Sequence, residues 1–248
     1  MLDDITQVYR ASRRAAAIAP LLFLIPAVAE FFQHVVEMRI GMYDSLAAAK
    51  AVANDPQRMQ AGFAKTIALL LPGYWFVRLM AFGDAARAKR IEQPAFGLWL
   101  VLLAFGVALL AWELFGPKTD ALLSLQGKAG ALTGPILSGL WMVIGVYLTG
   151  WYNAWPLGNA RIGPVSTFAL MAGTFWRTVG ITLACIVPLM VLHYALGFLA
   201  IAVTPAALDW VVLAVDAIAV SLLACTMAGS GYVAAAHAAR RKGVSLAG

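Results

Sequence analysis

A long apolar run near the C-terminus constrains the fold more than any other feature of this chain. The run from Trp210 to Ala236 is almost unbroken in Val, Leu, Ala, Ile and Gly, and it ends shortly before Arg240-Arg241-Lys242. At a rise of about 1.5 Å per residue, a helix of this length crosses about 30 Å of hydrocarbon. Basic residues beside a span mark its cytoplasmic end. We therefore predict a transmembrane helix whose C-terminal end lies in the cytoplasm.

The composition extends this prediction to the whole chain. Of its 248 residues, 62% are hydrophobic and 12% are charged. Soluble domains average roughly 45–50% apolar and about 25% charged residues. The sequence therefore predicts an all-α, polytopic membrane protein, with residues 1–248 forming a single integral membrane domain. Six segments are long and apolar enough to be spans, at about 15–36, 62–82, 96–115, 132–151, 178–203 and 209–236.

The distribution of basic residues predicts the orientation of these spans. Eleven Lys and Arg residues fall in segments expected on one side of the membrane, against six on the other. By the positive-inside rule, we expect both termini in the cytoplasm of a multi-pass protein. The same distribution accounts for the net charge of +6, so nucleic acid is not expected as a partner.

Two amphipathic segments are predicted to lie on the cytoplasmic membrane surface. Residues 3–14 begin with acidic and end with basic residues, and Ile5, Val8 and Tyr9 share one helical face. The segment 164–177 begins with a proline suited to the first turn of a helix. Its apolar face and its basic end are expected to contact the interface, through Phe168, Phe175, Trp176 and Arg177.

A short motif lies in and before this second segment. It consists of Pro156, Leu170, Gly173, Phe175, Trp176 and Arg177. The motif and the six-span layout resemble bacterial membrane proteins of the YciC-like and glycerophosphodiester-phosphodiesterase membrane-domain type. Thr167 stands where such proteins usually carry Ser, and no attached phosphodiesterase domain is seen in the sequence. The resemblance implies a membrane scaffold without known catalysis and assigns no catalytic residue.

Ionisable residues inside or beside the predicted spans gather at one depth, in the expected outer half. This candidate polar cluster consists of Glu30, His34, Lys65, Glu113, His193 and Asp216. A lone charge in hydrocarbon costs several kcal/mol, so such residues usually face other helices or water. One interpretation is an outward-facing cavity that binds a cation, relays a proton or receives a polar head group. In the other, Glu30, His34 and Glu113 reach the head groups while Asp216 hydrogen-bonds a neighbouring helix.

No metal, cofactor or catalytic residue is predicted. A metal site of Glu30, His34 and Glu37 is disfavoured because a single helix cannot close a coordination sphere. A lone histidine in a span, such as His193, is more often a hydrogen-bonded packing residue than a ligand of haem or chlorophyll. Nucleotide-binding, hydrolase and redox motifs are missing from the sequence, so enzymatic activity is not expected. Cys185 and Cys225 are expected to be buried, unpaired and apolar in character.

A small-residue face in the last span bears on possible partners. Gly229, Gly231 and Ala235 allow close helix approach, either within the chain or against another membrane subunit. We therefore expect a non-catalytic accessory or scaffolding subunit that associates with membrane lipids and with other integral membrane subunits. The alternative is a small transporter or channel with an acidic and histidine-containing site around Asp216.

Overall fold

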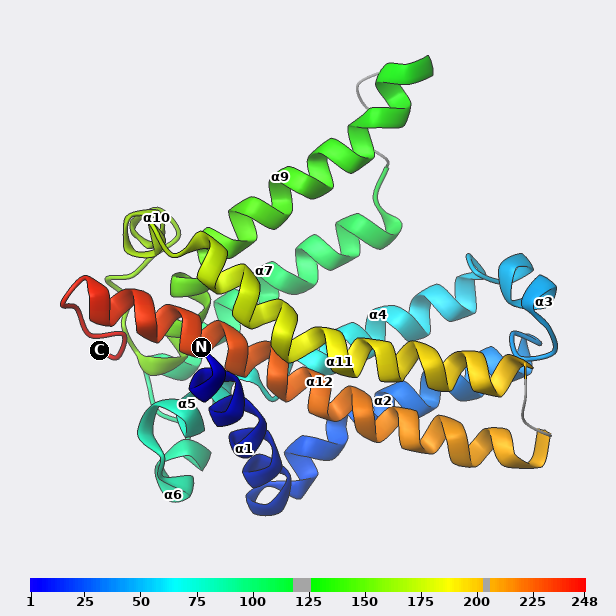
Figure 1. The fold of residues 1–248 in the computed structure, drawn as a ribbon, viewed down its shortest axis with the longest axis horizontal. Coiled ribbons are helices and arrows are strands. Elements are labelled where there is room, and N and C mark those ends of the chain that lie inside the picture. Colours follow the sequence, from blue (N-terminus) through cyan, green and yellow to red (C-terminus); the bar gives the residue numbers. More distant parts are fainter. Residues whose placement is uncertain (118–125, 203–205) are drawn as a thin grey trace. The chain divides into compact units, whose positions relative to one another are not determined.

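The computed structural model describes residues 1–117, 126–202 and 206–248, and these form α-helices joined by short connections (Figure 1). This confirms the predicted all-α class. The helices are α1 (Leu2–Ile18), α2 (Pro20–Arg39), α3 (Leu46–Ala51), α4 (Pro56–Leu70), α5 (Gly73–Phe82), α6 (Ala85–Lys89), α7 (Ala95–Phe115), α9 (Gly127–Ala154), α10 (Ser166–Met171), α11 (Phe175–Ala202) and α12 (Ala206–Arg241), with a 3₁₀ turn at Trp155–Leu157.

Six helical segments are long and apolar enough to cross a membrane, which agrees with the predicted number of spans. They are Pro20–Arg39, Pro56–Phe82, Ala95–Phe115, Gly130–Leu157, Phe175–Ile201 and Leu208–Arg241. Helix α9 begins at Gly127, before the predicted start of the fourth span near residue 132. The predicted outer turn at Thr204-Pro205 and part of the loop around Lys118 and Asp120 lie outside the described residues.

Prolines set the boundaries of the first two spans, and they move these boundaries from the predicted positions. The first span was predicted from about residue 15, but residues 15–18 belong to α1 and the span begins at Pro20. The preceding Ala19 has φ −140° and ψ 60°, outside the helical region, as expected for a residue before proline. The second span begins at Pro56 rather than near residue 62, because Asp55 caps α4 by accepting from Gln57 N at 2.8 Å.

The other prolines act differently within the spans. Pro72 lies in the short turn between the end of α4 and the start of α5. By contrast, α2 continues through Pro26 and α11 continues through Pro188. A proline inside a span could be expected to break its helix, but Pro26 and Pro188 do not. A transmembrane helix tolerates such a proline when neighbouring groups accommodate the lost backbone hydrogen bond.

The chain divides into two compact units. The first contains residues 1–90 and 180–230, and the second contains residues 91–179 and 231–248. Helices α11 and α12 contribute to both units by their sequence ranges. The single integral membrane domain predicted from the sequence stays a prediction.

The first unit packs α1 and α5 against the middle of α12. A Cβ atom on Gly229 would lie 2.8 Å from Val8 Cγ1 and 2.9 Å from Phe76 Cε1, so this approach requires glycine. Arg78 on α5 is only 1% exposed, although a long basic side chain near the end of a span could reach the membrane interface. Its guanidinium carbon lies 5.1 Å from the centre of the Tyr74 ring, a cation–π distance.

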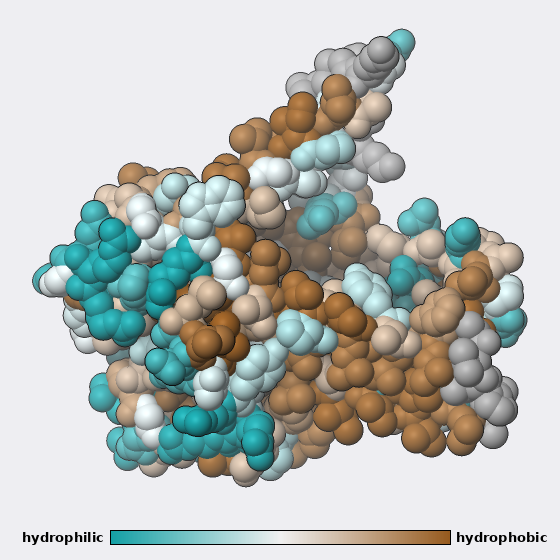
Figure 2. All heavy atoms as spheres, in the orientation of Figure 1, coloured by the Kyte–Doolittle hydropathy of each residue, from teal (hydrophilic) through white to brown (hydrophobic). Residues whose placement is uncertain are grey.

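In Figure 2, hydrophobic side chains cover the visible face of α11 and early α12, and hydrophilic side chains gather over α1 and α6.

The core of the second unit lies where α7 meets the end of α9. Leu102, Leu148 and Trp151 form this buried cluster. Thr167, on α10, fastens the chain to α9: its hydroxyl donates to Tyr147 O at 2.8 Å and accepts from Trp151 N at 3.1 Å. Thr167 therefore has a structural role in the second unit.

The second predicted interfacial helix is shorter than expected. It covers Ser166–Met171 as α10, and α11 then starts at Phe175. Gly173 lies between them with φ +78°, a left-handed conformation that ends helices and suits glycine. Arg241 Nη1 donates to Gly173 O at 2.8 Å. The predicted continuous apolar face over 164–177 is therefore divided between two helices.

A buried histidine and carboxylate cluster

One face of α2 carries four polar side chains that are buried in the first unit. Spacings of three and four residues place Glu30, Gln33, His34 and Glu37 on this face. Their exposed fractions are 0%, 5%, 3% and 3%. The sequence predicted Glu30 and His34 as candidate site residues, and Glu37 extends the same face by one turn. Because these groups lie in a span, they need partners from other helices.

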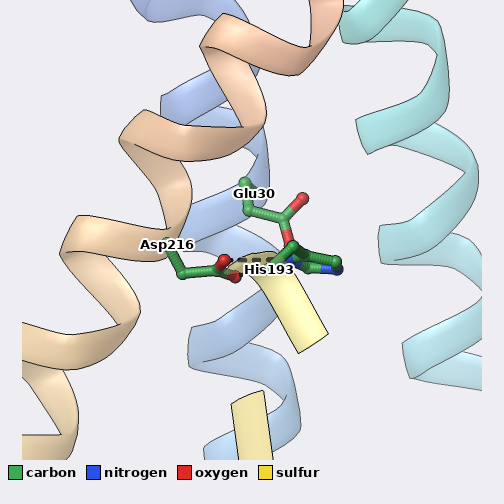
Figure 3. Close-up of side chains that lie close together, drawn as sticks. All are labelled: Glu30, His193 and Asp216. Carbon is green, nitrogen blue, oxygen red and sulfur yellow. Dashed lines mark hydrogen bonds and ion pairs between the residues drawn. The ribbon is translucent and has the colours of Figure 1, made fainter. Parts of the chain in front are cut away.

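Asp216 of α12 joins histidines from two other helices. His34 Nε2 and His193 Nδ1 lie 2.9 and 2.8 Å from its Oδ2 atom, and His193 Nδ1 lies 2.9 Å from Oδ1. Asp216 itself is 0% exposed. Figure 3 shows Asp216 and His193 facing each other, with the side chain of Glu30 beside them. The carboxylate can accept a hydrogen bond from each imidazole, which offsets part of its desolvation.

Glu30 faces both a lysine and a histidine. Lys65 Nζ, on α4, lies 3.3 Å from Glu30 Oε1 and 3.1 Å from Oε2. His34 Nε2 lies 3.4 Å from Glu30 Oε1. Lys65 therefore supplies a positively charged partner for Glu30. The Lys65 side chain is 18% exposed, so this edge of the cluster approaches the surface of the chain.

Glu37 organises the other end of the cluster. It accepts from Gln33 Nε2 at 2.7 Å, from Arg58 Nε at 3.0 Å and from the Tyr43 hydroxyl at 2.8 Å. Its Oε2 atom also lies 3.1 Å from His34 Nδ1. Burial first, and then the charge of Glu37, raise the pKa of Tyr43 above its ordinary value. The hydroxyl of Tyr43 therefore keeps its proton and acts as a donor to Glu37.

The charges of this cluster do not balance when both histidines are neutral. Three carboxylates belong to it, Glu30, Glu37 and Asp216, and two of them pair with cationic side chains, Lys65 and Arg58. One negative charge then remains, on the carboxylate that faces His34 and His193. A buried carboxylate without a compensating positive charge is unfavourable in a span. The arrangement therefore suits one additional positive charge beside Asp216.

Donor atoms of three helices converge at this position. Single ligand atoms from Glu30, His193 and Asp216 lie within 4.8 Å of one another. These residues belong to α2, α11 and α12, as Figure 3 shows. The sequence-based objection to a metal site, that one helix cannot close a coordination sphere, therefore does not apply to this set of residues.

The remaining sequence-predicted residues lie elsewhere. Glu113 is exposed near the end of α7, in the second unit, and is not one of the residues that the cluster contacts join. Ala235 is fully buried, and a Cβ atom on Gly231 would lie 3.0 Å from Asn153 Nδ2. With the close contacts of Gly229, this indicates that the small-residue face packs within the chain. Cys185 and Cys225 are buried and unpaired, as predicted.

The predicted interfacial residues are only partly available at the surface. The rings of Phe168 and Phe175 lie 5.5 and 6.0 Å from the ring of Tyr147 on α9. Trp176 is 81% exposed, and Phe168 is 42% exposed. Phe175 and Phe168 therefore contribute to packing in the second unit, whereas Trp176 is free to contact a membrane or a partner.

Sequence reasoning left several members out of the polar cluster. Glu37 was considered with Glu30 and His34 only as a disfavoured metal site, and Gln33 was not considered, although both follow their three- and four-residue spacing. Tyr43 and Arg58 lie outside the predicted spans and carry no periodic signal that relates them to α2. Arg58 reaches the cluster because Pro56 and Asp55 start α4 there, beside the end of α2.

Comparison with protein-family models, with curated proteins and with solved structures finds no match to this chain. The resemblance to YciC-like six-span proteins therefore stays a prediction that rests on the motif around residues 156–177.

Proposed function

We propose that this chain is a small membrane transporter or channel that binds a cation at the cluster around Asp216. The observation that carries this proposal is the fully buried Asp216 carboxylate, whose partners, His34 and His193, come from two other helices. Intramembrane ionisable residues of this kind are typical of ion or proton pathways. With both histidines neutral, the negative charge that remains on Asp216 favours a positively charged substrate over an anion.

The surroundings of the cluster support a route for such an ion. Its centre is buried, but the side chains of Lys65, Arg58 and His193 are 18%, 28% and 20% exposed. These three side chains are therefore the parts of the cluster closest to the surface of the chain, where an ion would enter. The interruption of the second span at Pro72 supplies a position at which α4 and α5 can move relative to one another.

A flux assay in proteoliposomes tests the proposal. Purified wild-type protein is reconstituted, and entry of K⁺, Na⁺, H⁺ and divalent cations is followed with trapped fluorescent indicators. We expect flux of at least one cation, and its loss in Asp216→Asn while reconstitution and gel-filtration behaviour are retained. Glu113→Gln, at an exposed acid outside the cluster, is the matched control and should transport like the wild type. Equal flux in wild-type and empty liposomes would contradict the proposal.

A second candidate function, the accessory or scaffolding subunit expected from the sequence, is favoured by the second unit. The buried residues of α7 are Ala95, Trp99 and Leu102, which leaves the later part of this helix exposed or half-buried. From residue 130 to residue 147 of α9, no described side chain is buried. Large side chains such as Trp112, Leu132 and Trp141 are about half exposed. Lipid or the helices of another membrane subunit would cover these surfaces.

Crosslinking in native membranes distinguishes a surface covered by lipid from one covered by another membrane subunit. A photoreactive amino acid at Trp141 on α9 should capture a protein if another subunit covers this surface. The same substitution at Ile181, which is fully buried, is the control for non-specific capture. Crosslinks to lipid alone would contradict the subunit function.

The proposed localisation is a bacterial inner membrane, with both termini in the cytoplasm. It is supported by the excess of Lys and Arg in alternate connections and by the basic residues at the end of α12.

A further inference from the structure

We propose that the cluster binds a divalent transition-metal ion, with Glu30, His193 and Asp216 as ligands and His34 as the adjoining fourth donor. This inference rests on the proposed transport function, because it names the class of cation that the same site would take. It is carried by the geometry of the donor atoms, by the hydrogen bonding of His34 and by the charge of the cluster.

The positions of the donor atoms are close to those that a metal ion requires. Ligands about 2.0–2.2 Å from a tetrahedral metal lie roughly 3.3–3.6 Å from one another. Ligand atoms of Glu30, His193 and Asp216 all lie within 4.8 Å of one another. His34 Nε2 lies 2.9 Å from Asp216 Oδ2 and 3.4 Å from Glu30 Oε1. Small side-chain rotations would therefore bring these donors to coordination distance.

The types of donor select the class of metal. Two imidazoles and two carboxylates offer nitrogen and oxygen atoms, and carboxylates from two helices face both rings. Ca²⁺ and Mg²⁺ prefer sites made of oxygen alone, and Cu⁺ prefers sulfur. A set with two histidines and a carboxylate is typical of sites for Zn²⁺, Mn²⁺ and Fe²⁺. These ions are the expected ligands.

The hydrogen bonds of His34 favour a ligand role for its other ring nitrogen. His34 Nδ1 lies 3.1 Å from Glu37 Oε2 and 2.8 Å from the Tyr43 hydroxyl. A metal-binding histidine usually donates its second N–H to a carboxylate or a carbonyl, which fixes the ring and its tautomer. Glu37 is placed to accept that proton, and Nε2 then faces the side of the ring where Glu30 and Asp216 lie.

Lys65 limits how tightly a metal ion can bind. Its ammonium group pairs with Glu30 at 3.1 Å and would repel a divalent ion held by the same carboxylate. The side chain is 18% exposed and can turn away from the cluster. Exchange of Lys65 for the metal ion at Glu30 would allow reversible binding, as a transported ion requires. Removing the lysine charge should therefore tighten metal binding.

Metal binding to the purified, tag-free protein in nanodiscs tests this inference without any flux measurement. Equilibrium dialysis with Zn²⁺ and with Mn²⁺ should give one bound ion per chain, and bound Co²⁺ should show the visible absorption of a site with few ligands. His193→Gln and Asp216→Asn should each weaken binding at least about tenfold. Two ligand variants are used because one of them can fail to fold. Glu113→Gln is the control and should bind as the wild type does.

Lys65→Met supplies a change in the opposite direction. It should bind Zn²⁺ several-fold more tightly than the wild type, a result that general unfolding of the cluster cannot produce. Wild-type affinity in both ligand variants, or no saturable binding by the wild type, would overturn the inference. Metal binding without flux would support the inference and contradict the transport function. Flux of a monovalent cation without metal binding would support the transport function and contradict the inference of a metal site.

Discussion

Asp216 shows how a carboxylate can be kept inside a transmembrane bundle. It is fully buried on α12, and its two oxygen atoms lie within 2.9 Å of nitrogen atoms of His34 and His193. These histidines come from α2 and α11, so Asp216 connects three helices that are distant in sequence. Asp216 therefore stabilises one arrangement of these helices. A change in the charge of Asp216 or of its histidine partners would alter that stability.

Removal of this carboxylate should destabilise the first unit. In Asp216→Ala, His34 and His193 lose their shared acceptor. Each buried hydrogen-bonding group left without a partner costs about 1–3 kcal/mol. We expect a loss of this order in reversible unfolding by SDS in mixed micelles. Ile218→Ala, at a 51% exposed position on the same helix, should change the unfolding free energy much less.

The residues of the site could be predicted only in part from the sequence. Depth within the spans identified Glu30, His34, His193 and Asp216, because charged residues in apolar segments are conspicuous. His34 and His193 contact Asp216 across 182 and 23 residues of sequence. Nothing in the sequence indicates that these helices pack together. Glu113 was grouped with these residues from depth alone, and depth does not specify the direction in which a side chain points.

Among the helices, α12 packs closely against α1 and α5 because Gly229 has no side chain at the contact. A Cβ atom on Gly229 would lie 2.8 Å from Val8 Cγ1 and 2.9 Å from Phe76 Cε1, closer than such contacts normally occur. Val8 is 0% exposed and Phe76 is 3% exposed, so neither has free space in which to move. This contact fixes the position at which α1 meets the membrane-spanning helices of its unit.

Gly229→Ala should therefore be destabilising, although alanine favours helices. Overpacking of this kind costs about 1–3 kcal/mol. The double variant Gly229→Ala, Val8→Ala should recover part of the loss, because removal of the Val8 methyl groups makes room for the new Cβ atom. Thermal unfolding in detergent measures all variants of the cycle. Strictly additive losses would show that the two residues do not share this contact.

A capping side chain marks the start of a helix more closely than hydropathy, which placed the start of the second span near residue 62 instead of at Pro56. Asp55 and Pro56 begin α4, and Ser45 caps α3 by accepting from Ala48 N at 3.1 Å. Proline alone was a poor guide. Helix α2 continues through Pro26, whereas Pro20 begins it. The difference depends on whether neighbouring residues can satisfy the backbone that proline leaves unpaired, which local sequence does not show.

Helix α1 offers a groove that suits an anionic head group. A cavity of about 480 Å³ lies between α1 and the end of α5, and Arg10 and Arg14 line it together with Leu79 and Met80. Arginine near a membrane surface contributes about 1 kcal/mol to the attraction of anionic lipid, or roughly fivefold in affinity. These two side chains are therefore expected to hold phospholipid phosphate at the interface.

Substitution of these arginines should reduce the retention of anionic lipid. Arg10→Gln and Arg14→Gln should each lower the amount of phosphatidylglycerol that stays bound in native mass spectrometry, relative to phosphatidylcholine. Arg13→Gln is the matched control, because Arg13 is exposed on the same helix and does not line the cavity. An equal effect of all three substitutions would indicate general surface charge and not a defined groove.

At the scale of the whole molecule, hydropathy was sufficient to predict six spans and the all-α class. Both depend on segment length and composition, which a bilayer requires of any spanning helix. Helix partners could not be predicted, because the apolar faces of spans are chemically alike and lipid can cover any of them. The division into two compact units depends on these partners, so hydropathy does not indicate it.

The orientation of the chain can be tested with cysteines placed at two exposed serines. Ser45 precedes α3, in the connection after α2, and Ser245 follows the basic end of α12. In a background with Cys185→Ala and Cys225→Ala, both at buried positions, a membrane-impermeant maleimide added to whole cells should label Ser45→Cys and leave Ser245→Cys unlabelled. Lysis should make both sites reactive. The opposite pattern in whole cells would invert the topology and place the cluster near the cytoplasmic side, so a transported ion would first reach Asp216 from the cell interior.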